Sequence, residues 1–198
     1  GFELNTSYKD IAMVSEIVWG YQQKYPTVTT LYQLGESTQG FPLLALRINQ
    51  KTKQKASKLP ILIVGGLHGN ELLTVDYALD NIKTLLENYQ QNAEFLSWMS
   101  ALDIWFIPLL NPDGNLLTLR KSAKKQNGRK NGRQTDTLCE NSPKEGVDLY
   151  HNFPYQWGSL GDKGSSKRPT KKNFRGFAPN SEPETQAISR LAQEHHFA

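Results

Sequence analysis

A histidine and a glutamate lie three residues apart in the segment Ile61–Glu71, ILIVGGLHGNE. The run Ile61–Val64 is apolar and β-branched, as in a strand buried on both faces, and the glycine pair after it ends the strand. His68 and Glu71 therefore lie on the loop after a strand, where ligands bind in open α/β sheets. Imidazole nitrogen and carboxylate oxygen are ligands for zinc. Taken alone, the spacing fits equally well a surface histidine and a glutamate favoured by a helix dipole.

Two further segments carry groups that could do chemistry. Asp148 and His151 lie in GVDLYHNFPYQWG, a short apolar segment that opens into an aromatic loop. The segment Lys121–Arg133 holds six basic residues, which indicates either a solvated loop or a positively charged wall of a site for an anionic group. Aromatic residues, which would favour single-stranded nucleic acid, are not interleaved with these charges.

The elements that must position these residues follow from apolar periodicity and turn chemistry. A strand, a helix and a second apolar strand in succession predict a βαβ unit with parallel strands and a right-handed crossover. NPDG after the second strand predicts a turn, and Ser181, Pro183 and Glu184 predict the start of a capped helix. The expected helices cover 7–25, 71–89, 93–99 and 181–194, and the expected strands 27–34, 43–48, 61–64 and 102–110, with a lead-in to another strand at the last residues.

Composition bounds the class of protein. The 198 residues suffice for one domain with a sizeable core, and a net charge of +4 is too modest to imply nucleic acid as a partner. No apolar run approaches the roughly 20 residues of a membrane span. Cys139 is the only cysteine, so no disulfide forms within the 198 residues, which leaves a cytoplasmic, periplasmic or secreted location open.

Five motifs in this order resemble the zinc carboxypeptidase family, peptidase family M14. They are HGNE after one apolar strand, NPDG after the next, GRKNGR, GVDLYHNFPYQWG and RGFAPNSEPETQA. The resemblance runs from the first predicted helix to the last residue. It implies a single α/β domain over 1–198 with a mixed, largely parallel sheet flanked by helices, the C-terminal portion of the domain being absent. It also implies a metallocarboxypeptidase that binds one zinc ion and acts on a peptide or peptide-like substrate.

The resemblance assigns roles to individual positions. His68 and Glu71 match the first two zinc ligands, and Asp148 matches the carboxylate that orients the ligand histidine. Arg129 matches the catalytic arginine that polarises the scissile carbonyl and stabilises the developing oxyanion. Arg120 is a competing candidate for that role, and Arg129 is preferred because its following Lys-Asn and its distance to Cys139 fit the family better.

Two departures from the family pattern concern substrate binding. Tyr150-His151 stands where the family usually has Asn-Arg, the pair that grips the free C-terminal carboxylate of a peptide. Tyr150 still offers one hydrogen bond, whereas an unperturbed histidine carries charge only near or below pH 6.5. Asn70 stands where digestive carboxypeptidases carry an arginine beside the ligand glutamate. We therefore expect a weaker carboxylate clamp or a different terminal group.

A third departure concerns the metal. The family's third ligand, a histidine, is expected a few residues beyond Ala198, and the tyrosine and general-base glutamate come later still. His195 and His196 are candidate substitutes, as is His151, although a position near a helix C-terminus also explains the first two.

Other functions stay open at this point. The chain could be a murein-peptide amidase or an acyl-amino-acid deacylase of the same fold, or an inactive, peptide-binding pseudoenzyme. On the expected ligands, the 198 residues alone have little activity and pair with their own C-terminal part.

Overall fold

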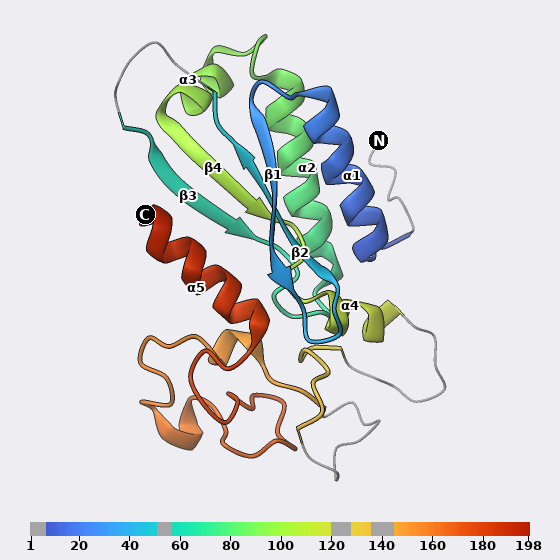
Figure 1. The fold of residues 1–198 in the computed structure, drawn as a ribbon, viewed down its shortest axis with the longest axis vertical. Coiled ribbons are helices and arrows are strands. Elements are labelled where there is room, and N and C mark those ends of the chain that lie inside the picture. Colours follow the sequence, from blue (N-terminus) through green and yellow to red (C-terminus); the bar gives the residue numbers. More distant parts are fainter. Residues whose placement is uncertain (1–6, 51–56, 120–127, 136–144) are drawn as a thin grey trace.

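The computed structural model describes residues 7–50, 57–119, 128–135 and 145–198, which form an α/β fold around a mixed sheet (Figure 1). The four strands lie in the order β1-β2-β4-β3. The elements are α1 (Ile11–Lys24), β1 (Thr29–Glu36), β2 (Pro42–Ile48), β3 (Leu59–Val64), α2 (Leu72–Asn88), α3 (Ala93–Ala101), β4 (Leu102–Ile107), α4 (Pro112–Leu119), the short 3-10 helices η2 (Leu149–His151) and η3 (Gly161–Lys163), and α5 (Pro183–His195).

Strand pairing confirms the predicted parallel pair and shows that the first two strands form a hairpin. β1 and β2 are antiparallel, and β2 is antiparallel to β4. β3 and β4 are parallel, with Leu59 opposite Leu102 and Val64 opposite Ile107, and α2 connects them. Because parallel strands end at the same edge, the loops that follow β3 and β4 meet there.

Helices cover both faces of the sheet (Figure 1). The apolar faces of α1 and α2 pack with β2 and β4 in the larger core, which includes Val18, Ile82 and Phe106. On the other face, Leu191 of α5 packs with Trp105 of β4 in a smaller cluster. The elements of the site gather below the arrowheads of β3 and β4 in Figure 1, next to the start of α5.

The apolar run of β3 predicts a strand that is buried on both faces, but this prediction is wrong. It is an edge strand within the described sheet, and Leu59 and Ile63 are 51% and 36% exposed. At its open edge, the backbone N–H of Ala198 donates to the carbonyl of Pro60 at 3.1 Å, although the last residues, predicted as the lead-in to a strand, are not themselves a strand. An apolar run alone does not separate a central strand from an edge strand that another segment covers.

Two predicted boundaries are wrong for local chemical reasons. NPDG is predicted as a turn between elements, but it forms the start of helix α4. The side chain of Asn111 accepts the N–H of Gly114 at 2.9 Å, and Pro112 needs no N–H partner at the first helical position. The N-cap of α5 is Glu182 and not Ser181, whose hydroxyl donates to Glu182 Oε1 at 2.7 Å.

Several predicted features lie outside the described residues. They include Arg120, Cys139 and most of the basic segment before Gly128. In the described ranges, no helix is both long and apolar enough to cross a membrane.

Trp105 links β4 to α5 and is the largest side chain in the smaller cluster, so its removal tests this layer. It is 1% exposed and lies 5.0 Å from the ring of Tyr32 and 4.6 Å from that of His195. We expect Trp105→Ala to lower the free energy of unfolding by about 3–5 kcal/mol in urea titrations. The control Trp19→Ala, at a position 59% exposed, should change it by about 0.5 kcal/mol or less. Equal losses in the two variants would contradict the packing of α5 on β4.

Candidate functional site

His68 lies between two carboxylates at the carboxyl end of β3. Its Nδ1 is 2.8 Å from Oε1 of Glu71, and its Nε2 is 3.0 Å from Oδ1 of Asp148. A carboxylate only accepts hydrogen bonds, so the Asp148 contact requires a proton on Nε2. In the neutral ring, Nδ1 then carries a lone pair that faces the lone pairs of Glu71 Oε1. Only a proton or a cation between these two atoms can interact favourably with both. The pair has the chemistry of half a metal site.

Asp148 is a fully buried anion that holds four groups together. Its Oδ2 accepts from Nε and Nη2 of Arg129 at 3.1 and 3.0 Å, while Oδ1 also accepts the backbone N–H of Tyr150 at 3.2 Å. Its own backbone N–H donates to the carbonyl of Phe174 at 2.8 Å. The side chain of Arg129 stays 29% exposed, so a substrate can reach it.

The contact between His68 and Asp148 raises the pKa of the histidine and lowers that of the carboxylate. The hydrogen bond to Asp148 raises the pKa of His68, against the opposing effect of burial, and the contact with Glu71 adds to the rise. Burial alone would raise the pKa of Asp148, but the His68 hydrogen bond and the Arg129 charge outweigh it and lower that pKa. Asp148 is therefore ionised at neutral pH, and the imidazole keeps its Nε2 proton.

Glycines let the loops of three motifs approach each other closely. A Cβ on Gly69 of HGNE would collide with the backbone of Gly114 and Asn115. A Cβ on Gly114 of NPDG would in turn collide with the carbonyls of Gly128 and Lys130. The loop after β3, the start of α4 and the segment of Arg129 are thus in direct backbone contact, which explains why glycine stands at these two positions.

The backbone of Arg129 is anchored to the other two loops. Its carbonyl accepts the N–H of Gly69 at 3.4 Å and the carboxamide of Asn111 at 3.3 Å. The Asn111 carboxamide also reaches the carbonyl of Leu67 at 3.4 Å. The backbone carbonyls of Leu67, which precedes His68, and of Arg129 therefore accept from the same carboxamide, that of Asn111.

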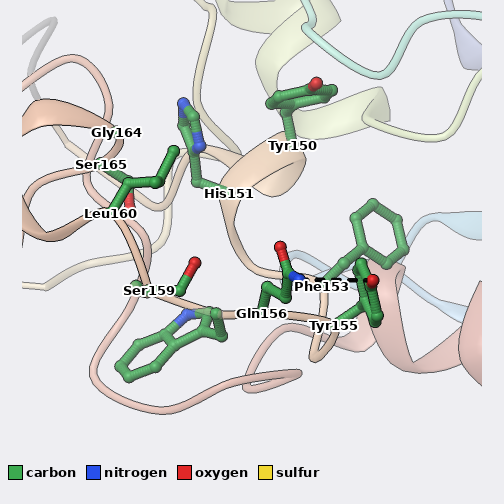
Figure 2. Close-up of a pocket in the computed structure, with 11 residues that line it drawn as sticks. Tyr150, His151, Phe153, Tyr155, Gln156, Ser159, Leu160, Gly164 and Ser165 are labelled. Atoms are coloured by element: carbon green, nitrogen blue, oxygen red, sulfur yellow. Dashed lines mark hydrogen bonds between the residues drawn. The ribbon is translucent and has the colours of Figure 1, made fainter.

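Tyr150 and His151 lie on η2 beside His68, while Asn70 lies between the two candidate metal ligands on the HGNE loop. The Tyr150 ring centroid is 6.3 Å from that of His68 and 5.1 Å from that of His151. Both side chains line a cavity of about 290 Å³ whose walls include Phe153, Trp157 and Ser159. Figure 2 shows the His151 imidazole and the Ser159 hydroxyl on the walls of this cavity.

His151 is less easily charged than an ordinary histidine. Burial lowers its pKa, the positive charges of Arg129 and His68 lower it further, and Asp148, 4.0 Å from Nε2, opposes them. The position that the family resemblance assigns to an arginine is therefore uncharged at neutral pH.

The other histidines do not join this cluster. His195 stacks on Trp105 on a face of the sheet, and His196 is the left-handed C-cap of α5. Within the described parts of the chain, no three or more His, Cys, Asp or Glu side chains form a group that could hold a metal. His68 and Glu71 are brought together as predicted, with no third ligand among these residues.

Sequence reasoning missed the buried residues behind Arg129. Asn131, Glu182 and Glu184 are 1% exposed or less, and the Asn131 carboxamide bonds both carboxylates. The prediction gave Glu184 a capping role, whereas its side chain accepts the N–H of Thr38 at 3.2 Å. Alternation of polar and apolar residues carries no signal for such long-range polar contacts.

Comparison with known proteins gives one consistent result. The family model described as zinc carboxypeptidase matches residues 15–198. The chain is 30% identical to carboxypeptidase O of Bos taurus over 87% of its own length and 43% of that protein. It is 31% identical to metallocarboxypeptidase A of Trichophyton tonsurans over 100% of its length and 44% of that protein. The structure resembles that of carboxypeptidase A from Helicoverpa armigera, with a TM-score of 0.80, 28% identity and coverage of 96% of this chain and 43% of that one. The chain thus spans less than half of the length of these relatives.

Asp148→Asn tests the charge coupling at the centre of the site. Without the carboxylate, the hydrogen bond that raises the pKa of His68 is weakened while Arg129, which lowers it, remains. We expect the pKa of His68 to fall from its raised value, measured by NMR titration of the metal-free protein. A His68 pKa unchanged by the substitution would contradict the contact.

Proposed function

We propose, because the chain belongs to the zinc carboxypeptidase family, that it forms part of a zinc-dependent hydrolase that cleaves a C-terminal peptide bond. The observation that carries the proposal is the His68–Glu71 pair with a buried carboxylate behind the imidazole. The carboxypeptidase names of its relatives support the reaction class. We infer that a third ligand and the general base come from outside the described residues, because catalytic zinc sites usually have three protein ligands.

The residues present fit a zinc ion. Nδ1 of His68 and Oε1 of Glu71 face each other, and a bound cation would take the place of a proton between them. Asp148 fixes the tautomer in which Nδ1 carries no proton and can bind the ion. Bound zinc polarises a carbonyl and activates water. The raised pKa of His68 means that protons compete with the metal as the pH falls through that pKa.

The chain's own residues then have distinct tasks. Asp148 keeps the proton on Nε2 of His68 and holds the Arg129 guanidinium by two nitrogens. The exposed part of Arg129 is placed to stabilise negative charge on the carbonyl oxygen as water adds, which is where a fixed cation lowers the barrier. Tyr150 and His151, which line the cavity, and Asn70 on the HGNE loop bind the substrate.

A second candidate within the same fold is favoured by the neutral His151. An enzyme that selects a free C-terminal carboxylate benefits from a permanent cation at this position, and His151 has a lowered pKa instead. An amidase acting on murein peptides, or a deacylase of acylated amino acids, places less demand on that charge. A panel of plain and γ-glutamyl-linked peptides separates these activities from carboxypeptidase activity.

The zinc proposal is tested with the full-length protein. We expect about one zinc per molecule by metal analysis, loss of that zinc in His68→Ala, and about 10- to 100-fold weaker zinc binding in Asp148→Ala. His196→Ala is the matched control and should keep both zinc and activity, because His196 caps α5. Full-length protein that holds no zinc and hydrolyses no C-terminal bond would refute the proposal.

The terminal-group proposal is tested by restoring the cation. His151→Arg should lower the KM for peptides with a free C-terminal carboxylate by about tenfold, since a hydrogen bond to a charged group contributes about 1.5–3 kcal/mol. The same peptides with an amidated C-terminus are the control and should show little change. An equal effect on both series would exclude His151 from recognition of the terminal group.

A further inference from the structure

Asn131 ties the segment of Arg129 to the segment of Asp148. Its backbone N–H donates to the carbonyl of Val147 at 3.1 Å, and its side-chain oxygen accepts the N–H of Val147 at 2.9 Å. The same oxygen accepts the N–H of Arg133 at 3.3 Å. Two of these three bonds end on the residue before Asp148, and Asn131 itself is two residues after Arg129. The side chain is fully buried.

Two carboxyl groups from the start of α5 orient this carboxamide. The side-chain nitrogen donates to Oε2 of Glu182 at 2.7 Å and to Oε2 of Glu184 at 3.3 Å. Arg133 places Nη1 3.1 Å from the other oxygen of Glu182. Because acceptors lie on one side and backbone donors on the other, only an amide of this length satisfies the position with both of its polar atoms.

Other groups complete a shell around the amide. Glu184 also accepts the N–H of Thr38 in the turn between β1 and β2. Asp113 at the start of α4 accepts from Ser37 and from the N–H of Gln39 in the same turn. Burial raises the pKa of Glu184 to about 7, helped by the nearby charge of Asp113. The shell therefore connects the hairpin, α4 and α5 to the chain segment that carries Arg129.

The backbone carbonyl of Arg129 is held by two long hydrogen bonds. The bonds from Gly69 and Asn111 to its carbonyl measure 3.4 and 3.3 Å, longer than the bond between Val147 and the Asn131 oxygen. The guanidinium depends on Asp148, and the two bonds between Asn131 and Val147 help to place Asp148 relative to Arg129.

We propose that Asn131 is a positioning residue, which sets Arg129 against Asp148 so that the guanidinium meets the reacting carbonyl beside His68 and Glu71. This inference rests on the hydrolase function proposed above. The hydrogen bonds of Asn131 among the described residues do not reach His68 or Glu71, so it acts through Arg129. A displacement of about 1 Å in such a group lowers the rate by as much as about 100-fold.

The first test is Asn131→Asp in the full-length, zinc-loaded protein. The substitution keeps the shape but places an acceptor opposite Glu182 and Glu184. We expect kcat and kcat/KM to fall together by about 10- to 100-fold, because the lost interaction acts in the transition state, with zinc content unchanged. Asn131→Ser, which adds no charge, is the second variant and should show the same pattern if the aspartate variant does not fold.

A double-mutant cycle separates positioning from a general loss of structure. In an Arg129→Ala background, Asn131→Asp should lower kcat/KM by no more than about twofold, since the group it positions is gone. The control is Asn115→Ala, an equally buried amide on α4 that bonds the carbonyl of Lys9 at 3.3 Å. Its effect should be the same in both backgrounds. A full effect of Asn131→Asp without Arg129, or none with it, would overturn the proposal.

A measurement without catalysis keeps the inference independent of the proposed reaction. The Nε–H of Arg129 donates to Asp148, so its NMR signal, identified by its loss in Arg129→Lys, should exchange slowly with water. We expect this exchange to be at least about tenfold faster in Asn131→Ser and unchanged in Asn115→Ala. Unaltered exchange would refute the positioning role. If the wild-type protein shows no zinc-dependent hydrolysis, the proposed function is refuted. The exchange rate of the Arg129 Nε–H then still tests whether Asn131 positions Arg129.

Discussion

The site depends on a single buried anion, the carboxylate of Asp148. A carboxylate that is removed from water destabilises the fold unless charged or polar partners replace its hydration. Here both oxygens are used: one by His68 and the N–H of Tyr150, the other by two nitrogens of Arg129. The same interaction that makes burial of the charge tolerable also fixes the ring orientation of one candidate ligand and the plane of the guanidinium. Stability and function therefore select the same geometry.

A second constraint is the contact among the loops that carry the motifs. The parallel pairing of β3 and β4 brings HGNE and NPDG to one edge of the sheet, but it does not determine the distance between these two loops. Glycine at 69 and 114 closes that separation, because any Cβ there would meet backbone atoms of the neighbouring loop. The third segment, around Arg129, has no strand of its own and is placed by these contacts and by Asn131. A site built of backbone contacts tolerates little change in its loops.

The sequence predicted the local parts of this arrangement well. Apolar runs and glycines identified β3, β4 and the loop of His68, and the order of five motifs identified the family that the comparison confirms. It failed where one residue type serves two purposes. Pro and Asp in NPDG suit a turn as well as the first turn of a helix, and the difference depends on the Asn111 cap. Ser181 is a good N-cap by type, yet its hydroxyl bonds Glu182.

The remaining errors and omissions arise from contacts between distant segments. The apolar residues of β3 predicted burial on both faces, but the strand has one neighbour in the described sheet, and periodicity does not report the number of neighbours. The contacts of Asn131 with Glu182 and Glu184 span 51 and 53 residues. No pattern within one element encodes them. Positions that hold a site in place are for this reason harder to find by motif than the positions that do its chemistry.

The two candidate ligands differ in how firmly the fold holds them. The His68 side chain is 10% exposed and is fixed from behind by Asp148, whereas the Glu71 side chain is 46% exposed and lies at the N-cap of α2 without a capping hydrogen bond. If both residues bind a metal as proposed, the histidine would fix its position, and the glutamate side chain would have room to change its distance to the ion. Such a division suits a metal whose remaining ligands come from elsewhere in the protein. In the proposed zinc site, His68 would hold the ion in one place, and the more exposed Glu71 would adjust to it.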